Sequence, residues 1–95
     1  MRYFTETQMD SVGDFNGQEA TAVAIIDSIL EKIEDIINET YGTDANIIIE
    51  NANETQNIVW EHVCDYSTPL DETETAHNRA AALIFPFVEI SEIGE

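Results

Sequence analysis

The most reactive side chains of this sequence lie close together in the segment HVCD. His62, Cys64 and Asp65 belong to this segment, and His77 follows in the next polar stretch. A zinc site needs three or four ligands at a recognisable spacing, and one H-x-C pair with a remote histidine does not supply them. A cysteine nucleophile would need an oriented base and an oxyanion hole, and no glycine-rich turn is present to form one. We therefore expect a buried thiol beside a hydrogen-bonded histidine, with no metal site and no catalytic site.

A second group of residues that could do chemistry is the acidic cluster Asp71, Glu72 and Glu74. Carboxylates suit hard cations, but this segment lacks the glycine and the regular oxygen spacing of a calcium-binding loop. The four glycines of the chain form no phosphate-cradling loop. Among the 20 acids, no pair stands out as the two carboxylates of a glycosidase-type site. The sequence thus predicts a protein that is not an enzyme and that uses no cofactor.

The strongest feature of the composition is its charge. The 95 residues include 20 acids and three basic residues, which gives a formal net charge of -17 and a pI of about 4.1. Such a surface repels nucleic acid and anionic membranes, so we expect no direct contact with either. No apolar run approaches the roughly 18 residues of a membrane span, and the N-terminus does not look like a secretory signal. With a single cysteine, the chain is expected to be a cytoplasmic protein.

A helical period dominates the first half of this sequence, which is expected to form a single domain over residues 1–95. Asn16 followed by Glu19 is a capping box, and Gly42 is a C′ stop signal. The apolar residues between Ala22 and Tyr41 fall within roughly 160° of a helical wheel, with acids on the opposite arc. The sequence therefore predicts one long amphipathic helix of roughly 37 Å.

The second half of the sequence favours strands. NIIIE (46–50) is a short β-branched run, and NIVWEHVCDY (57–66) alternates two sets of side chains. RAAALIFPFVEI (79–90) predicts a long strand, in which Pro86 demands an edge or bulged position because it cannot donate a hydrogen bond. The polar segments that separate the three runs are expected to form a turn and an acidic loop.

These elements together predict an α+β fold. One long amphipathic helix would pack on a three-stranded antiparallel β-sheet, a meander, with a short N-terminal arm or strand at residues 2–4. Trp60 is expected in the core between the helix and the sheet. A helical period also fits 57–66, and 71–84 is open between strand and helix as well.

The acidic arc of the predicted helix is nearly free of compensating cations. Residues 27–39 hold five acids and Lys32 over roughly 18 Å, about one net charge per 4.5 Å. This density approaches the one charge per roughly 3.4 Å of a nucleic-acid strand. Because like charges at i,i+4 cost a few tenths of a kcal/mol each, their accumulation points to a gain in function. We predict that a partner is contacted by the carboxylates of Asp27, Glu31, Glu34, Asp35, Glu39, Asp71, Glu72 and Glu74.

A short acidic chain with one lysine resembles, as a class, the nucleic-acid mimics that phages encode. These include anti-restriction proteins, anti-CRISPR proteins and uracil-DNA glycosylase inhibitors. The resemblance implies a non-enzymatic inhibitor, a monomer or small homo-oligomer, in the cytoplasm of a bacterial host. Its partner would be a basic nucleic-acid-binding protein or ribonucleoprotein complex of host defence or DNA processing, whose channel it blocks. An alternative comes from layout: residues 20–90 are similar to the helix-plus-meander order of phage tail-completion proteins, which form rings.

Overall fold

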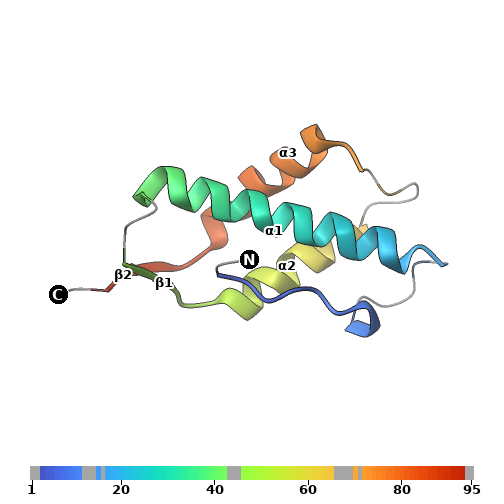
Figure 1. The fold of residues 1–95 in the computed structure, drawn as a ribbon, viewed down its shortest axis with the longest axis horizontal. Helices are drawn as coiled ribbons and strands as arrows, with labels where there is room; N and C mark the ends of the chain where they lie inside the picture. Colours follow the sequence, from blue (N-terminus) through green and yellow to red (C-terminus); the bar gives the residue numbers. More distant parts are fainter. Residues whose placement is uncertain are drawn as a thin grey trace.

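A computed structural model of the chain describes residues 3–11, 15, 17–42, 46–65, 70 and 72–93. The elements are η1 (Met9–Ser11), α1 (Glu19–Tyr41), β1 (Ile47–Ile49), α2 (Ala52–Asp65), α3 (Glu74–Ile84), η2 (Phe85–Phe87) and β2 (Ile90–Glu92). The helix α1 packs against both α2 and α3, and the two short strands lie together at one end of the molecule (Figure 1). The resulting shape is elongated, with extents of 48 × 25 × 18 Å.

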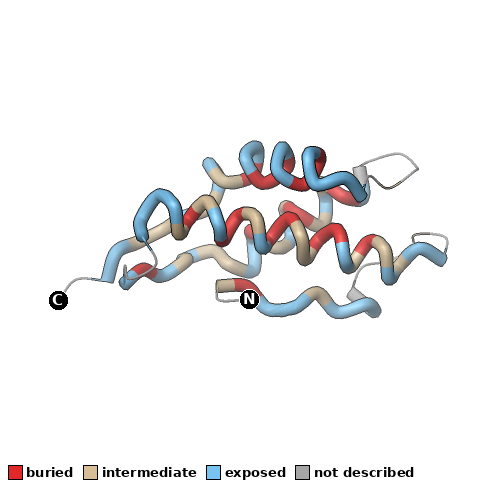
Figure 2. The backbone as a smooth tube through the Cα atoms, turned by 45° about the horizontal axis from the view of Figure 1, so that its top comes forward, coloured by how far each residue is buried: buried red, intermediate tan, exposed pale blue. Residues whose placement is uncertain are grey.

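Helix α1 confirms the long amphipathic helix that the sequence predicts. Its buried face is made of Ile26, Ile29, Leu30, Ile33 and Ile37, each at most 2% exposed. This spacing of three and four residues keeps these side chains on one stripe of the helix. Burying each of them stabilises the fold by about 1.5–3 kcal/mol relative to leaving it in water. Figure 2 shows buried residues alternating with intermediate and exposed ones along this helix.

The two ends of α1 differ in how far they follow the sequence prediction. Gly42 ends the helix with a φ of 87°, and its N–H donates to the carbonyl of Asn38, so the predicted stop is confirmed. The helix begins at Glu19, after an N-cap residue, Gln18, whose side chain makes no capping hydrogen bond. The capping box therefore does not hold in the predicted register, and its other member, Asn16, lies outside the described residues.

The predicted strands at 57–66 and 79–90 are wrong, because most of both segments is helical. In α2 the buried positions are Thr55, Val59 and Val63, which recur every fourth residue and pack against α1 and α3. The β-branched and aromatic residues of 57–66 favour strands only weakly, and this tertiary packing overrides that preference. In α3 a run of alanines, which are the best helix formers, supplies a small-residue face that lies close against α1.

The described residues form a two-stranded ribbon instead of the predicted three-stranded meander. The strands β1 and β2 are antiparallel, with Ile48 opposite Ser91. β1 confirms the strand predicted at 46–50, whereas β2 is much shorter than the predicted strand at 79–90. Pro86 lies in η2, where the missing N–H is tolerated, and this turn separates α3 from β2. The sheet is therefore too small to serve as the layer that covers α1. The helices α2 and α3 cover α1 instead.

Residues 3–8 form an extended segment, here called the N-terminal arm, which runs beside α1 and α2 (Figure 1). Phe4 is 5% exposed and belongs to the core. The arm is also tied to α2, because Gln56 Nε2 donates to the carbonyl oxygen of Thr5 at 2.7 Å. The arm predicted at 2–4 is thus present at Tyr3 and Phe4 and continues to residue 8, and Arg2 lies outside the described residues. The arm lies over one side of the acidic arc of α1.

The N-terminus of α3 offers a test of this helical assignment. Thr73 is its N-cap, and the side-chain oxygen accepts a hydrogen bond from the N–H of Ala76 at 3.3 Å. We expect Thr73→Ala to lower the free energy of unfolding by about 1 kcal/mol, because a helix N–H loses its acceptor. Urea denaturation followed by circular dichroism measures this change. Thr75→Ala, at the exposed second residue of α3, is the matched control and is expected to change stability by less than about 0.5 kcal/mol. An equal loss in both variants would contradict the cap.

Candidate functional site

Carboxylates are spread over the described surface. Exposed acids occur on the arm, in η1, and on or beside all three helices and the ribbon: Glu6, Asp10, Glu31, Asp35, Glu39, Glu50, Glu54, Glu61, Glu72, Glu74, Glu89 and Glu92. Two basic residues lie in the described ranges, Lys32 and Arg79. The surface potential is therefore negative on several faces of the molecule, and a cationic partner is attracted from many directions.

Three acids of α1 form a regular line, which we call the α1 acidic row. Glu31, Asp35 and Glu39 are all exposed and follow one another at intervals of four residues. Successive members are therefore separated by about 6 Å along the helix axis. The row resembles the phosphate backbone of a nucleic-acid strand, because both are lines of negative charge. Its charges are more widely spaced, since a strand carries one charge every roughly 3.4 Å.

The two remaining α1 acids of the predicted contact hold the N-terminal arm. Glu34 is 7% exposed, and its Oε2 accepts hydrogen bonds from the backbone N–H groups of Tyr3 at 2.8 Å and Phe4 at 3.3 Å. Asp27 is partly buried, and its Oδ1 accepts from the N–H of Thr7 at 3.1 Å. The helical wheel places both carboxylates on the acidic arc, but in the fold the arm covers them. With the arm in this position, Glu34 cannot reach a partner.

The acids near the start of α3 are brought next to α1 by the single lysine. Lys32 Nζ lies 3.2 Å from Oε1 of Glu74, although the two residues are 42 positions apart. The Glu74 side chain is 80% exposed, so this pair contributes little to stability, about 0–1 kcal/mol. Glu72 is exposed beside it, and Asp71 lies outside the described residues. The pairing neutralises the lysine within the region where α1 and α3 meet.

A hollow lies between α1 and α3 next to the acidic row. It encloses about 280 Å³ and is lined by Lys32, Asp35, Ile36, Glu39, Asn78 and Ala81. Two members of the α1 acidic row thus border a depression rather than a flat surface. A basic side chain that enters it meets carboxylates on the α1 side.

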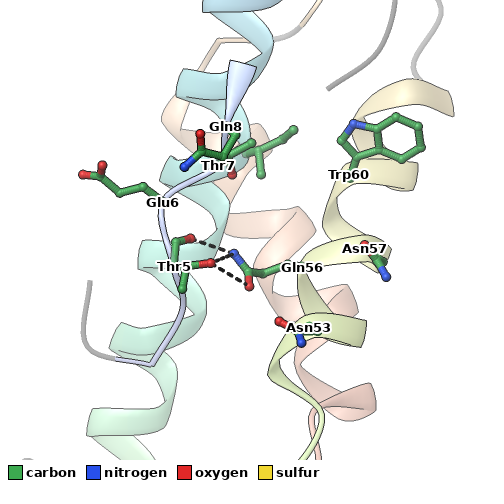
Figure 3. Close-up of a pocket in the computed structure, with 9 residues that line it drawn as sticks. Thr5, Glu6, Thr7, Gln8, Asn53, Gln56, Asn57 and Trp60 are labelled. Carbon is green, nitrogen blue, oxygen red and sulfur yellow. Dashed lines mark hydrogen bonds between the residues drawn. The ribbon is translucent and has the colours of Figure 1, made fainter. Parts of the chain in front are cut away.

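A larger pocket separates the N-terminal arm from α2 (Figure 3). It encloses about 390 Å³, and Thr5, Glu6, Thr7 and Gln8 form the arm side. Its other lining residues are Ile26 of α1 and the α2 residues Asn53, Gln56, Asn57 and Trp60. This site was not predicted, because the predicted strand placed Trp60 in the core and residues 51–56 were expected to form a turn. The signal was the spacing of the α2 residues by three, four and seven positions, which is one face of a helix.

The residues that suggested metal or thiol chemistry do not converge. Cys64 is exposed, so the expected buried thiol is wrong. His77 is buried in α3, where its Nδ1 lies 2.8 Å from the hydroxyl oxygen of Ser28 in α1 and so links the two helices. Within the described ranges, no three histidine, cysteine or acidic side chains come together as they would around a metal ion.

Comparison with known proteins gives no family to which this chain belongs. No protein-family model matches it, and no curated protein or solved structure shows significant similarity to it. Among the described residues, no helix combines the length and the apolarity that crossing a membrane requires. Function must therefore be inferred from the charge and geometry of the surface.

Proposed function

We propose that this protein is a non-enzymatic inhibitor that imitates nucleic acid and blocks the basic channel of a nucleic-acid-binding protein or ribonucleoprotein complex. As the resemblance to phage-encoded mimics implies, it would act in the cytoplasm of a bacterial host as an anti-CRISPR or anti-restriction protein. Its target would be a complex of host defence or DNA processing. It would act as a monomer or small homo-oligomer and without contacting nucleic acid itself.

The observation that carries this proposal is the α1 acidic row together with the charge around it. The net charge of -17 equals that of about 29 Å of duplex DNA, at one charge per roughly 1.7 Å. The longest extent of the molecule is 48 Å. A duplex of that length would carry about 28 charges, so the protein bears roughly 60% of the charge of a duplex as long as itself. Within the row, Glu31, Asp35 and Glu39 are exposed and make none of the bonds to the arm that occupy Asp27 and Glu34. These three carboxylates can meet a cationic surface without any change in the fold.

The alternative of a ring-forming phage assembly protein loses its support. It was based on the order of a helix and a three-stranded meander, and the described residues form three helices and a two-stranded ribbon. The high like charge also opposes the close packing of many copies in a ring, since each contact would bring acidic surfaces together.

The proposal predicts a partner that is captured at low salt and displaced by nucleic acid. The immobilised protein is incubated with nuclease-treated bacterial lysate, and bound proteins are eluted either with duplex DNA or RNA or with rising salt. We expect a basic nucleic-acid-binding protein to be released by nucleic acid. The affinity of the purified pair is expected to fall roughly tenfold or more between about 50 and 200 mM salt, because screening weakens steering and contact alike.

Competition by nucleic acid is the decisive part of this experiment. An acidic protein of equal net charge but unrelated fold serves as the matched bait, and partners held by both baits are discarded as non-specific. Capture of a partner that nucleic acid does not displace, or recovery of no nucleic-acid-binding protein at low salt, would contradict the proposal.

A further inference from the structure

The pocket between the arm and α2 has one aromatic wall, one apolar surface and several neutral polar edges. Trp60 lies on the opposite side of the opening from Thr7 and Gln8, and the hydrogen bonds between Thr5 and Gln56 close one end (Figure 3). Ile26 contributes the apolar surface from α1. The volume of about 390 Å³ lies within the range of small-molecule sites and is enough for one side chain of a partner.

The polar groups of this pocket can accept hydrogen bonds from a ligand that carries several donors. Gln8, Asn53 and Asn57 each carry an amide oxygen, and Thr7 adds a hydroxyl oxygen that can accept as well. The amide of Gln56 and the hydroxyl of Thr5 are already hydrogen-bonded to each other. None of the nine lining residues is basic. The side chain of Glu6 extends away from the opening in Figure 3, so its charge acts at the rim.

The charge of the molecule decides the sign of the ligand. With a net charge of -17, anions such as phosphates are repelled from any surface opening, whereas cations are concentrated there. The indole of Trp60 adds a preference for a planar cation, because a guanidinium group stacks on an aromatic face and keeps its N–H donors free at its edge. An ammonium group is attracted by the same negative field, but it lacks the planar shape and the fork of N–H donors of a guanidinium group.

From these features we infer that the arm–α2 pocket is a binding site for a guanidinium group, the head of an arginine side chain presented by the partner. The guanidinium lies against the indole of Trp60 and donates to the amide and hydroxyl oxygens of the walls. That the arginine comes from the partner rests on the proposed function, since a basic nucleic-acid channel is rich in this residue. That the pocket binds guanidinium does not depend on the proposed function.

The chain has one tryptophan, and it lines the pocket, so intrinsic fluorescence reports occupancy directly. The probes are the N-acetyl methylamides of arginine, lysine and citrulline, titrated at constant ionic strength. We expect a saturable change with the arginine probe at millimolar concentration, as is usual for so small a ligand. The lysine and citrulline probes are expected to bind at least roughly tenfold more weakly, because one lacks the plane and the other lacks the charge. Absence of saturation with arginine, or equal binding of either analogue, would overturn the inference.

Two lysine substitutions locate the site. Asn57→Lys puts a cation on the α2 wall and is expected to weaken binding of the arginine probe roughly tenfold or more, by like-charge repulsion. Asn46→Lys makes the same change at an exposed position before β1, away from the pocket, and is expected to alter binding less than about twofold. Equal effects of both variants would show that the probe follows the general field, and would refute a site at the pocket.

The same variants separate this inference from the proposed function. The probe titrations contain no partner, so they can fail while capture by nucleic-acid competition succeeds, and the reverse also holds. With the captured partner, Asn57→Lys is expected to raise the dissociation constant at least roughly tenfold more than Asn46→Lys. If the probe binds and the two variants bind the partner alike, the arginine does not come from that partner, and this part of the inference is wrong.

Discussion

Reversal of the α1 acidic row is expected to abolish inhibition while leaving the fold intact. The triple variant Glu31→Lys, Asp35→Lys and Glu39→Lys changes the net charge from -17 to -11, because each reversal adds two positive charges. All three positions are exposed, so the core is unaffected. We expect affinity for the captured partner to fall roughly 100-fold or more, since attraction becomes repulsion at several contacts at once. Titration calorimetry or surface plasmon resonance at low salt measures the loss.

A matched triple reversal distinguishes the row from charge in general. Glu50→Lys, Glu89→Lys and Glu92→Lys reach the same net charge at exposed positions in and beside the ribbon. This variant is expected to lose less than about tenfold in affinity, because it weakens the long-range field but not the contact. Should the ribbon variant lose more than the row variant, the contact face lies at the ribbon and the α1 row is not the site.

Removal of the Glu34 carboxylate is expected to release the N-terminal arm. Glu34→Ala leaves the N–H groups of Tyr3 and Phe4 without their acceptor. Either these amides stay buried and unsatisfied, or the arm detaches and exposes Phe4, and each outcome costs about 2–3 kcal/mol. We expect the free energy of unfolding to fall by this amount, and the amide of Phe4 to lose its protection in hydrogen exchange. Chemical denaturation and exchange measured by nuclear magnetic resonance provide the two readouts.

The neighbouring acid provides the control for the arm. Glu31→Ala removes the same charge one turn earlier, from an exposed side chain, and is expected to change stability by less than about 0.5 kcal/mol. Glu34→Gln keeps one oxygen acceptor and is expected to restore part of the loss. If Glu34→Ala unfolds the chain no more easily than Glu31→Ala does, the arm is not held by this carboxylate.

Part of the fold could be read from the sequence because its signal is local. The period of Ile26, Ile29 and Ile33 specifies α1 whatever lies against it, and Gly42 supplies a backbone conformation that other residues rarely adopt. Over 57–66 the signals conflict, since alternation and β-branched residues favour a strand while Val59 and Val63 also fit a helix. That choice depends on packing against α1 and α3, which no local window contains.

The candidate site divides in the same way. The charge of Glu31, Asp35 and Glu39 and their place on the polar side of α1 follow from the sequence. The burial of Glu34 does not, because it depends on an arm that returns from 30 positions away. The pocket beside Trp60 was equally out of reach, since its walls are an extended segment and a helix that only the tertiary structure brings together.

The position of Lys32 beside the α1 acidic row has a practical consequence for chemical labelling. Lys32 is the single lysine of the chain, and it borders the same hollow as Asp35 and Glu39. An amine-reactive dye therefore has one lysine side chain as its target in this sequence. A fluorophore attached there would be a neighbour of the carboxylates proposed to meet the partner, and its emission would follow association without any engineered cysteine.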